Sequence, residues 1–136
     1  MLQHKLSQRS LQRLVGVHSD LVRTVVLGLQ LSPVDFGVHE GRRTLERQKY
    51  LVKKGVSWTL KSRHLTGHAV DLWIYKPGFT GVDWNDWDSC NLMIDAVLEA
   101  GNRLGVPVES GYRMWGKDAP HFQLPGVLSY IDPVPV

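Results

Sequence analysis

The segment SRHLTGHAVDL, residues 62–72, places His64, His68 and Asp71 within eight positions of one another. Imidazole nitrogen and carboxylate oxygen are ligands of zinc and similar metals, and a catalytic site keeps three protein ligands with one position open for water. His64 and Asp71 can supply two of these ligands. A structural role for each residue stays open at this point, because His and Asp occur at such spacings by chance as well.

A second polar group stands in KDAPHFQL, residues 117–124. His121 begins a strand-like stretch there and is a candidate for the third ligand. Asp118 lies three residues before His121. A carboxylate that stands beside a metal without binding it can take the proton of the attacking water, so Asp118 is a candidate general base.

His68 competes with this assignment, because His64 and His68 are four residues apart and would share one face of a helix. Position 65 holds no Glu, Gly67 weakens a helix, and the residues that follow have a strand-like pattern. We therefore predict that His68 is a surface or rim histidine and not a ligand. The same prediction covers His4, His18 and His39.

Hydrophobic periodicity predicts the strands and helices that would position these side chains. In AVDLWIY, residues 69–75, strand alternation puts Asp71 on the face opposite to Val70, Leu72 and Ile74. Further strands are expected in DFGVHEG, ending at Gly41, and at 106–109 and 121–124, with helices at 20–31, 44–54 and 84–104. Mixed helices and strands predict an α+β fold, with helices packed on a short, mainly antiparallel sheet that carries the metal site.

Length and composition predict a single domain. The chain has 136 residues, 43% of them hydrophobic, which suits one ordinary core. We expect the domain to span 1–136, with a core of about 17–124 and a Pro-rich tail at 125–136. No apolar run is long enough for a membrane helix, and the N-terminus lacks the apolar region of a signal peptide, so we expect synthesis in the cytoplasm. The single cysteine, Cys90, excludes an intramolecular disulfide and is expected to be buried.

Positive charge is concentrated between Arg42 and Arg63, where Glu46 is the only acid. Such a face would favour nucleic acid, an acidic lipid surface or a cell-wall polymer, although a solvated helix surface is the more common explanation of such a charge run. No nucleic-acid motif accompanies the charge. Three acids in DWNDWD, residues 83–88, do not have the spacing of a calcium loop and are explained by the positive end of a helix.

The two polar segments also resemble signatures of a known family. SRHLTGHAVDL and DAPHFQL are similar to the S-x-H-x-x-G-x-A-x-D and D/E-x-x-H motifs of the zinc D-Ala-D-Ala carboxypeptidase and L-alanyl-D-glutamate peptidase family. VHEGRRTLERQ, residues 38–48, resembles the family's G-x-R-T segment. The resemblance covers about residues 17–124, and the family includes vancomycin-resistance dipeptidases and phage endolysins.

The resemblance implies a role for each matching residue. His64, Asp71 and His121 would hold Zn²⁺, and Asp118 would be the catalytic base. Arg43 would steady the substrate carbonyl and the oxyanion that develops on it. Further expectations concern Ser62 as a supporting or substrate-contacting residue, Gly67 as a backbone position in a tight turn, and Tyr112 and Trp115 as aromatic contacts to substrate. The family often has Glu where this chain has Gln123, which places the tuning of the metal in question but not the ligand set.

The resemblance further implies hydrolysis of the peptidoglycan stem peptide, most simply at the L-Ala-D-Glu bond in a phage or prophage endolysin. D-Ala-D-Ala carboxypeptidase activity and a non-catalytic wall-binding module are the alternatives. We also expect a monomer that binds no nucleic acid and does not insert into membranes. We expect it to reach the wall after holin-type release.

Overall fold

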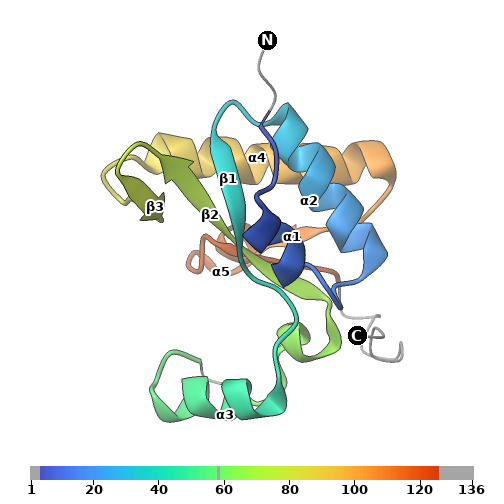
Figure 1. Cartoon of the computed structure of the whole chain (residues 1–136), viewed down its shortest axis with the longest axis vertical. Helices are drawn as coiled ribbons and strands as arrows, with labels where there is room; N and C mark the ends of the chain where they lie inside the picture. Colours follow the sequence, from blue (N-terminus) through green and yellow to red (C-terminus); the bar gives the residue numbers. More distant parts are fainter. Residues whose placement is uncertain (1–3, 58, 126–136) are drawn as a thin grey trace.

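A five-stranded antiparallel sheet forms the centre of the molecule (Figure 1). The computed structural model describes residues 4–57 and 59–125. The strands run in the order β1-β2-β5-β4, and β3 pairs with β2 beside that path. The strand bounds are β1 Asp35–Glu40, β2 Ala69–Lys76, β3 Phe79–Gly81, β4 Glu109–Ser110 and β5 His121–Gln123.

Helices complete the α+β architecture, which confirms the predicted fold class of a small single domain. Within the described residues these are α1 Gln8–Arg13, α2 Ser19–Leu31, α3 Leu45–Lys53, α4 Trp87–Leu104, α5 Gly111–Trp115 and a 3₁₀ helix, η1, Arg63–Thr66. The three helices expected at 20–31, 44–54 and 84–104 correspond to α2, α3 and α4. No described helix is both long enough and apolar enough to cross a membrane.

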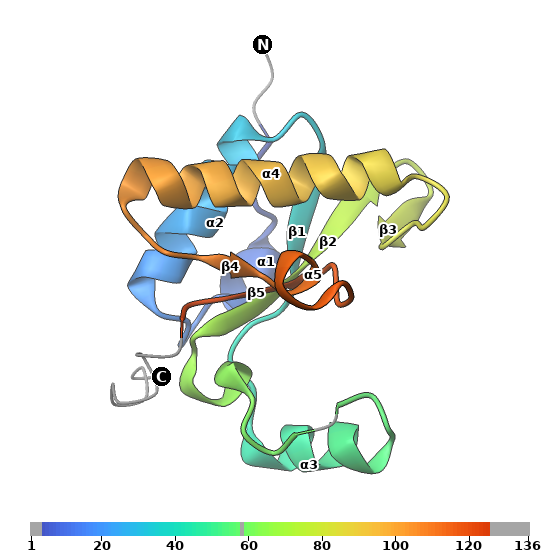
Figure 2. The same cartoon turned by 180° about the vertical axis from the view of Figure 1, so that it is seen from behind.

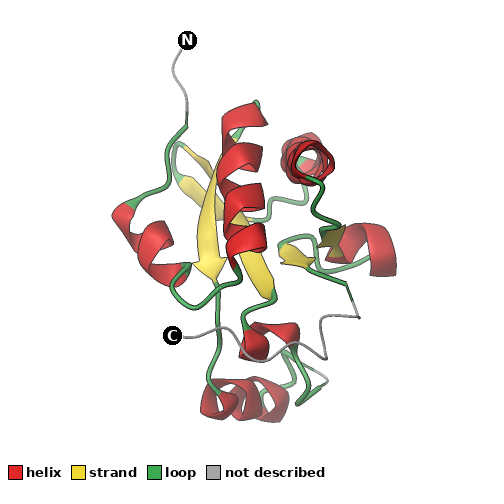
Figure 3. Ribbon diagram, turned by 90° about the vertical axis from the view of Figure 1, so that its right-hand side faces the viewer, coloured by secondary structure: helices red, strands yellow, loops and turns green. Residues whose placement is uncertain are grey.

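The core lies where α2 and α4 pack together and against the sheet (Figures 2 and 3). Gly28 permits this close packing, because a Cβ there would lie 3.1 Å from the Cα of Val97. On β2, Val70, Leu72 and Ile74 are buried while Asp71 and Trp73 are only partly buried, as the alternation predicted. Asp71 is thereby directed away from the core and toward the face where a site can form.

The helix α1, which the sequence did not predict, protects the open edge of β1. The hydroxyl of Ser10 accepts a hydrogen bond from the backbone N–H of Val38 at 2.9 Å, and the guanidinium of Arg13 donates to the carbonyl of Val38 at 3.0 Å. An uncovered strand edge would leave these backbone groups open to pairing with another chain. β3 and α5 were also not predicted, since both are too short to produce a clear periodicity.

The helix α3 lies apart from the sheet, at the lower end of the molecule in Figure 1. Its buried side chains are Gln48 and Leu51. The Gln48 amide donates to the hydroxyl of Ser57 at 2.9 Å and to the carbonyl of Thr59 at 2.6 Å, which ties the helix to the returning chain. Half of the cations of the predicted basic face lie on α3 or at its end, where Arg47, Lys49, Lys53 and Lys54 are exposed.

Three further predictions concern the acids of DWNDWD, the burial of Cys90 and the Pro-rich tail. In DWNDWD, Asp86 caps the N-terminus of α4 and, with Asp83, holds the ammonium of Lys76 at 2.9 and 3.0 Å. Cys90 is buried, as expected, and burial raises the pKa of its thiol. Residues 126–136 of the predicted Pro-rich tail lie outside the described residues.

Candidate metal centre

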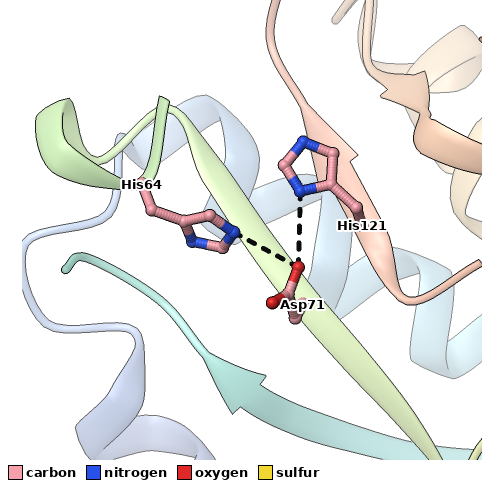
Figure 4. A group of neighbouring side chains, drawn as sticks. All are labelled: His64, Asp71 and His121. Atoms are coloured by element: carbon pink, nitrogen blue, oxygen red, sulfur yellow. Dashed lines mark hydrogen bonds and ion pairs between the residues drawn. The ribbon is translucent and has the colours of Figure 1, made fainter. Parts of the chain in front are cut away.

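His64, Asp71 and His121 converge on one point at the face of the sheet (Figure 4). Asp71 on β2 lies directly opposite His121 on β5 in the antiparallel register, and η1 brings His64 to the same place. One oxygen of Asp71 lies 3.2 Å from Nε2 of His64 and 3.4 Å from Nδ1 of His121. One ligand atom from each residue lies within 4.8 Å of the others, so the three predicted ligands form a candidate metal group.

The outer nitrogen of each imidazole has a partner that fixes the ring. Nδ1 of His64 lies 2.8 Å from the carbonyl of Gly41, so in the neutral ring Nδ1 carries the proton and donates it. Nε2 of His121 lies 2.8 Å from the amide oxygen of Gln123 and donates to it in the same way. Both rings then direct an unprotonated nitrogen toward Asp71. Two imidazole nitrogens and one carboxylate oxygen match the donor set of a catalytic zinc site.

Gln123 is itself oriented by a further contact, because its amide nitrogen donates to Glu109 at 3.3 Å. The amide oxygen is therefore the atom that faces His121. A glutamine at this position can perform the orienting role that a carboxylate would have. The departure from the family's common Glu leaves the ligand geometry intact.

Electrostatics within the group fit a site that favours a cation. Although burial opposes it, the neighbouring His64 and the close contacts of Asp71 with the rings of His121 and His64 hold the pKa of Asp71 well below its usual range. Burial also opposes ionisation of His121, yet its hydrogen bond with Asp71 and the charge of that carboxylate raise the pKa of His121. Asp71 is therefore an anion at neutral pH, and its negative charge favours a metal ion between the two rings.

Arg43 lies beside the metal group, and only 8% of its side chain is exposed. Its Nε and one Nη donate to both oxygens of Glu40 at 2.8 and 3.1 Å, and the other Nη donates to the amide oxygen of Gln48 at 2.6 Å. The Nη that faces Glu40 also lies 3.7 Å from Asp71. Although burial opposes it, the hydrogen bond from Arg43 lowers the pKa of Glu40. Arg43 is therefore a charged group held in one position.

Glu40 and Gln48 are the positioning residues that the sequence analysis missed. Glu40 stands three residues before Arg43, in the quoted VHEGRRT segment, and this spacing was an available signal. For Gln48, the sequence indicates only a position on a helix. It does not show whether the glutamine side chain is buried or exposed. Its position between Arg43 and Thr59 depends on how the chain returns after α3.

Asp118 lines a cavity that opens beside the metal group, and it is not a member of that group. Its backbone has φ of 65°, the only positive value for a described residue other than glycine. Asp is one of the residues that tolerates this conformation. Burial of its carboxyl group, with the nearby charge of Asp71, raises the pKa of Asp118. Asp118 is thus a carboxylate that lines the cavity without belonging to the metal group.

The cavity above the metal group has a volume of about 720 Å³. Trp115 lines it, with its ring 5.3 Å from the ring of His121. Ser62 lines it too, although its hydroxyl caps η1 by accepting from the N–H of His64 at 3.2 Å. Tyr112 is not among the lining residues and packs instead on Trp87, with ring centroids 4.5 Å apart. Gly67 has φ of 80° at the end of η1, which agrees with its expected backbone role.

The prediction that His68 is a surface histidine is wrong, because only 1% of it is exposed. His68 has the same parity as Val70 and Leu72, so the turn at Gly67 directs it to the buried side of the sheet. Its Nδ1 lies 2.7 Å from the hydroxyl of Thr66, and its Nε2 has no hydrogen-bond partner within the described part of the chain. It does not belong to the metal group found among the described residues.

The remaining histidines, His4, His18 and His39, are partly buried, as predicted for surface or rim positions, and each has a structural contact. His18 caps α2, where its Nδ1 accepts from the N–H of Asp20 at 3.1 Å. His39 stacks on Trp73 with ring centroids 3.5 Å apart, and burial lowers the pKa of His39. His4 is partly buried, with its Nδ1 3.9 Å from a carboxylate oxygen of Asp35.

Three comparisons relate this chain to known proteins. Residues 2–123 match the family described as phage L-alanyl-D-glutamate peptidase. A curated L-alanyl-D-glutamate peptidase of Escherichia phage T5 is 32% identical over 110 residues, which cover 79% of each chain. The crystal structure of the Serratia marcescens L-Ala D-Glu endopeptidase ChiX is similar with a TM-score of 0.79 and 44% identity. That similarity covers 90% of this chain and 91% of the other.

Proposed function

The chain belongs to the phage L-alanyl-D-glutamate peptidase family, and from this premise we propose that it is a zinc peptidase that cuts peptidoglycan stem peptides between L-Ala and D-Glu. The convergence of His64, Asp71 and His121 beneath a cavity is the observation that carries the zinc assignment. The related proteins bear L-Ala-D-Glu names, so the D-Ala-D-Ala alternative has no support from them.

The proposed mechanism divides the chemistry between the bound metal and the protein. Zinc, when bound, supplies a Lewis acid that polarises the scissile carbonyl and acidifies a water molecule. Asp118 takes the proton of the attacking water and later delivers it to the nitrogen of the departing D-Glu. A raised pKa suits this role, because an effective general base has a pKa closer to the operating pH than an ordinary carboxylate has.

Arg43 is the proposed stabiliser of negative charge on the carbonyl oxygen. Its contacts with Glu40 and Gln48 fix the guanidinium before substrate binds, so no reorganisation is needed when charge develops. Trp115 offers an aromatic surface at the wall of the cavity for the peptide. Ser62 contributes mainly by fixing η1 and with it the backbone of His64.

Digestion of purified peptidoglycan tests the bond assignment. Mass spectrometry of the products is expected to reveal new C-terminal L-Ala and new N-terminal D-Glu, in a reaction that stops after chelation and resumes with added zinc. New termini at D-Ala would instead support the carboxypeptidase alternative. Binding to the wall without new termini would support the non-catalytic module.

The cellular setting is part of the proposal. We infer that the protein accumulates in the cytoplasm, reaches the wall through a holin-type pore and acts as a monomer. Co-expression with a holin should therefore cause lysis that neither protein causes alone, and light scattering should give the mass of one chain. A gel shift across salt concentrations tests nucleic-acid binding by the basic face, for which we expect no retention at physiological salt.

A further inference from the structure

The charged residues around the cavity are unevenly distributed. Its lining contains four cationic side chains and two acidic ones, Asp71 and Asp118. One of the cations, Arg43, lies beside the metal group and donates to Glu40. The other three form what we call the basic rim, defined as Lys61, Arg63 and Lys117.

The basic rim adjoins the catalytic machinery on two sides. Arg63 immediately precedes the ligand His64 and Lys61 lies three residues before it, while Lys117 immediately precedes Asp118. A substrate group that contacts the rim therefore lies close to the scissile bond. This placement differs from that of Lys49 and Lys53, which are exposed on α3 and do not line the cavity.

Arg63 is the best-positioned member of the rim. It is half-buried, and one of its Nη atoms donates to the backbone carbonyl of Pro125 at 3.3 Å. That acceptor is neutral, so it fixes the side chain without cancelling its charge. In the part of the chain that the structure describes, neither Arg63 nor Lys61 forms a salt bridge.

The substrate named for this family supplies a matching anion, and at this point the inference rests on the proposed function. A D-Glu residue has two carboxyl groups, and only one of them can continue the peptide chain. The other remains as a free carboxylate or is blocked as an amide. The nitrogen of this same residue belongs to the scissile bond, so the second carboxyl group lies within a few bonds of the reacting atoms.

We propose that the basic rim binds the second, free carboxylate of the D-Glu residue, with Arg63 as its principal contact, and so selects stem peptides in which that carboxylate is not amidated. A guanidinium presents parallel N–H groups that match the two oxygens of a carboxylate. An amide offers one oxygen and no charge, and it directs N–H groups toward the cations of the rim. The rim therefore determines specificity on the leaving side of the bond.

Two synthetic stem peptides that differ only in this group test the proposal with the zinc-loaded protein. One carries the free carboxylate on D-Glu and the other carries the amide. We expect kcat/KM for the free acid to exceed that for the amide by roughly tenfold or more, since hydrogen bonds to charged groups contribute about that factor. Both peptides are measured at the same ionic strength, so that general attraction between charges stays constant.

Variants then locate the contact. Arg63→Gln should lower kcat/KM strongly for the free-acid peptide and much less for the amide peptide. The ratio of the two kcat/KM values should therefore approach one. Arg63→Lys should restore part of that ratio because it keeps the charge. Lys61→Gln and Lys117→Gln should reduce the ratio less, and Lys49→Gln on the outer surface of α3 is the matched control that should leave it unchanged.

Zinc content and thermal stability of each variant exclude a loss of fold as the cause. Equal cleavage of both peptides by the unmodified protein would overturn the carboxylate site while the proposed function stands. Loss of activity in the rim variants by the same factor for both peptides would overturn it too. Cleavage of neither peptide at the L-Ala-D-Glu bond would instead contradict the proposed function.

Discussion

Two pairs of histidines in this molecule have similar distances between their rings, but their ring nitrogens have different contacts. The rings of His64 and His121 have centroids 5.2 Å apart, and those of His18 and His68 have centroids 5.4 Å apart. Asp71 lies between the nitrogens of the first pair. Within the described residues, His68 of the second pair has one contact to a hydroxyl and one buried nitrogen without a hydrogen-bond partner.

The pKa shifts of the two regions have opposite directions. Despite its burial, His121 has a raised pKa because Asp71 stabilises the protonated ring. Burial lowers the pKa of His68, and the charges of His18 and Arg63 act in the same direction. Two close imidazoles therefore do not define a metal site by themselves. A carboxylate between them and a fixed partner for each outer nitrogen are also needed.

Removal of a ligand should have the largest effect and tests this comparison directly. We expect the protein to bind about one zinc ion per chain, and His64→Ala, Asp71→Ala and His121→Ala each to lose most of it. His68→Ala should keep the metal, because its side chain faces the core. Inductively coupled plasma analysis of dialysed protein measures the content. Full zinc in His121→Ala together with loss in His68→Ala would reverse the assignment of the two pairs.

Asp118→Asn should have the next largest effect, this time on turnover alone. The substitution keeps the size of the side chain and removes the base, whose proton transfer contributes about 10²- to 10⁴-fold to the rate. Zinc content and thermal stability should remain near those of the unmodified protein. The assay pairs zinc stoichiometry with turbidity loss of outer-membrane-stripped cells on the same preparation. A variant that retains zinc and most of the lytic rate would exclude Asp118 as the base.

Arg43→Ala should lower turnover by about a hundredfold while zinc stays bound, if the guanidinium stabilises developing charge. Its loss also leaves the partly buried Glu40 without this cation, so the double variant Arg43→Ala with Glu40→Gln separates catalysis from stability. Kinetics on a defined stem peptide, alongside zinc analysis, provide the measurement. Arg42→Ala should change turnover little. Equal losses in both single variants would point to general attraction between the basic face and the wall.

The smallest predicted effect concerns His68 and the pH dependence of stability. Because burial lowers its pKa from 6.5, the folded state binds fewer protons than the unfolded state at mildly acidic pH. The contribution of neutral His68 to the free energy of unfolding is therefore complete at pH values above its ordinary pKa. It is lost as the pH falls toward the lowered pKa of the folded state. We expect Tm to decrease less between pH 7 and pH 5 in His68→Gln than in the unmodified protein. His4→Gln is the control, and the same slope in all three proteins would contradict the prediction.

Local patterns in the sequence were enough for much of the fold. The alternation in residues 69–75 predicted both the strand and the face that Asp71 occupies. Helical periodicity predicted α2, α3 and α4. The ligand set followed from residue types that have few chemical roles, combined with the resemblance to a family, and the structure brings all three residues together.

Other features depend on contacts between distant segments, which no local pattern encodes. The register that places Asp71 opposite His121 is set by the pairing of β2 with β5, and the place of Gln48 beside Arg43 is set by the return of the chain after α3. His68 shares its residue type with the ligands and lies four residues after one of them, yet it is buried. The sequence determined which groups could act as ligands, whereas only tertiary packing decided which imidazoles would meet a carboxylate and which would meet the core.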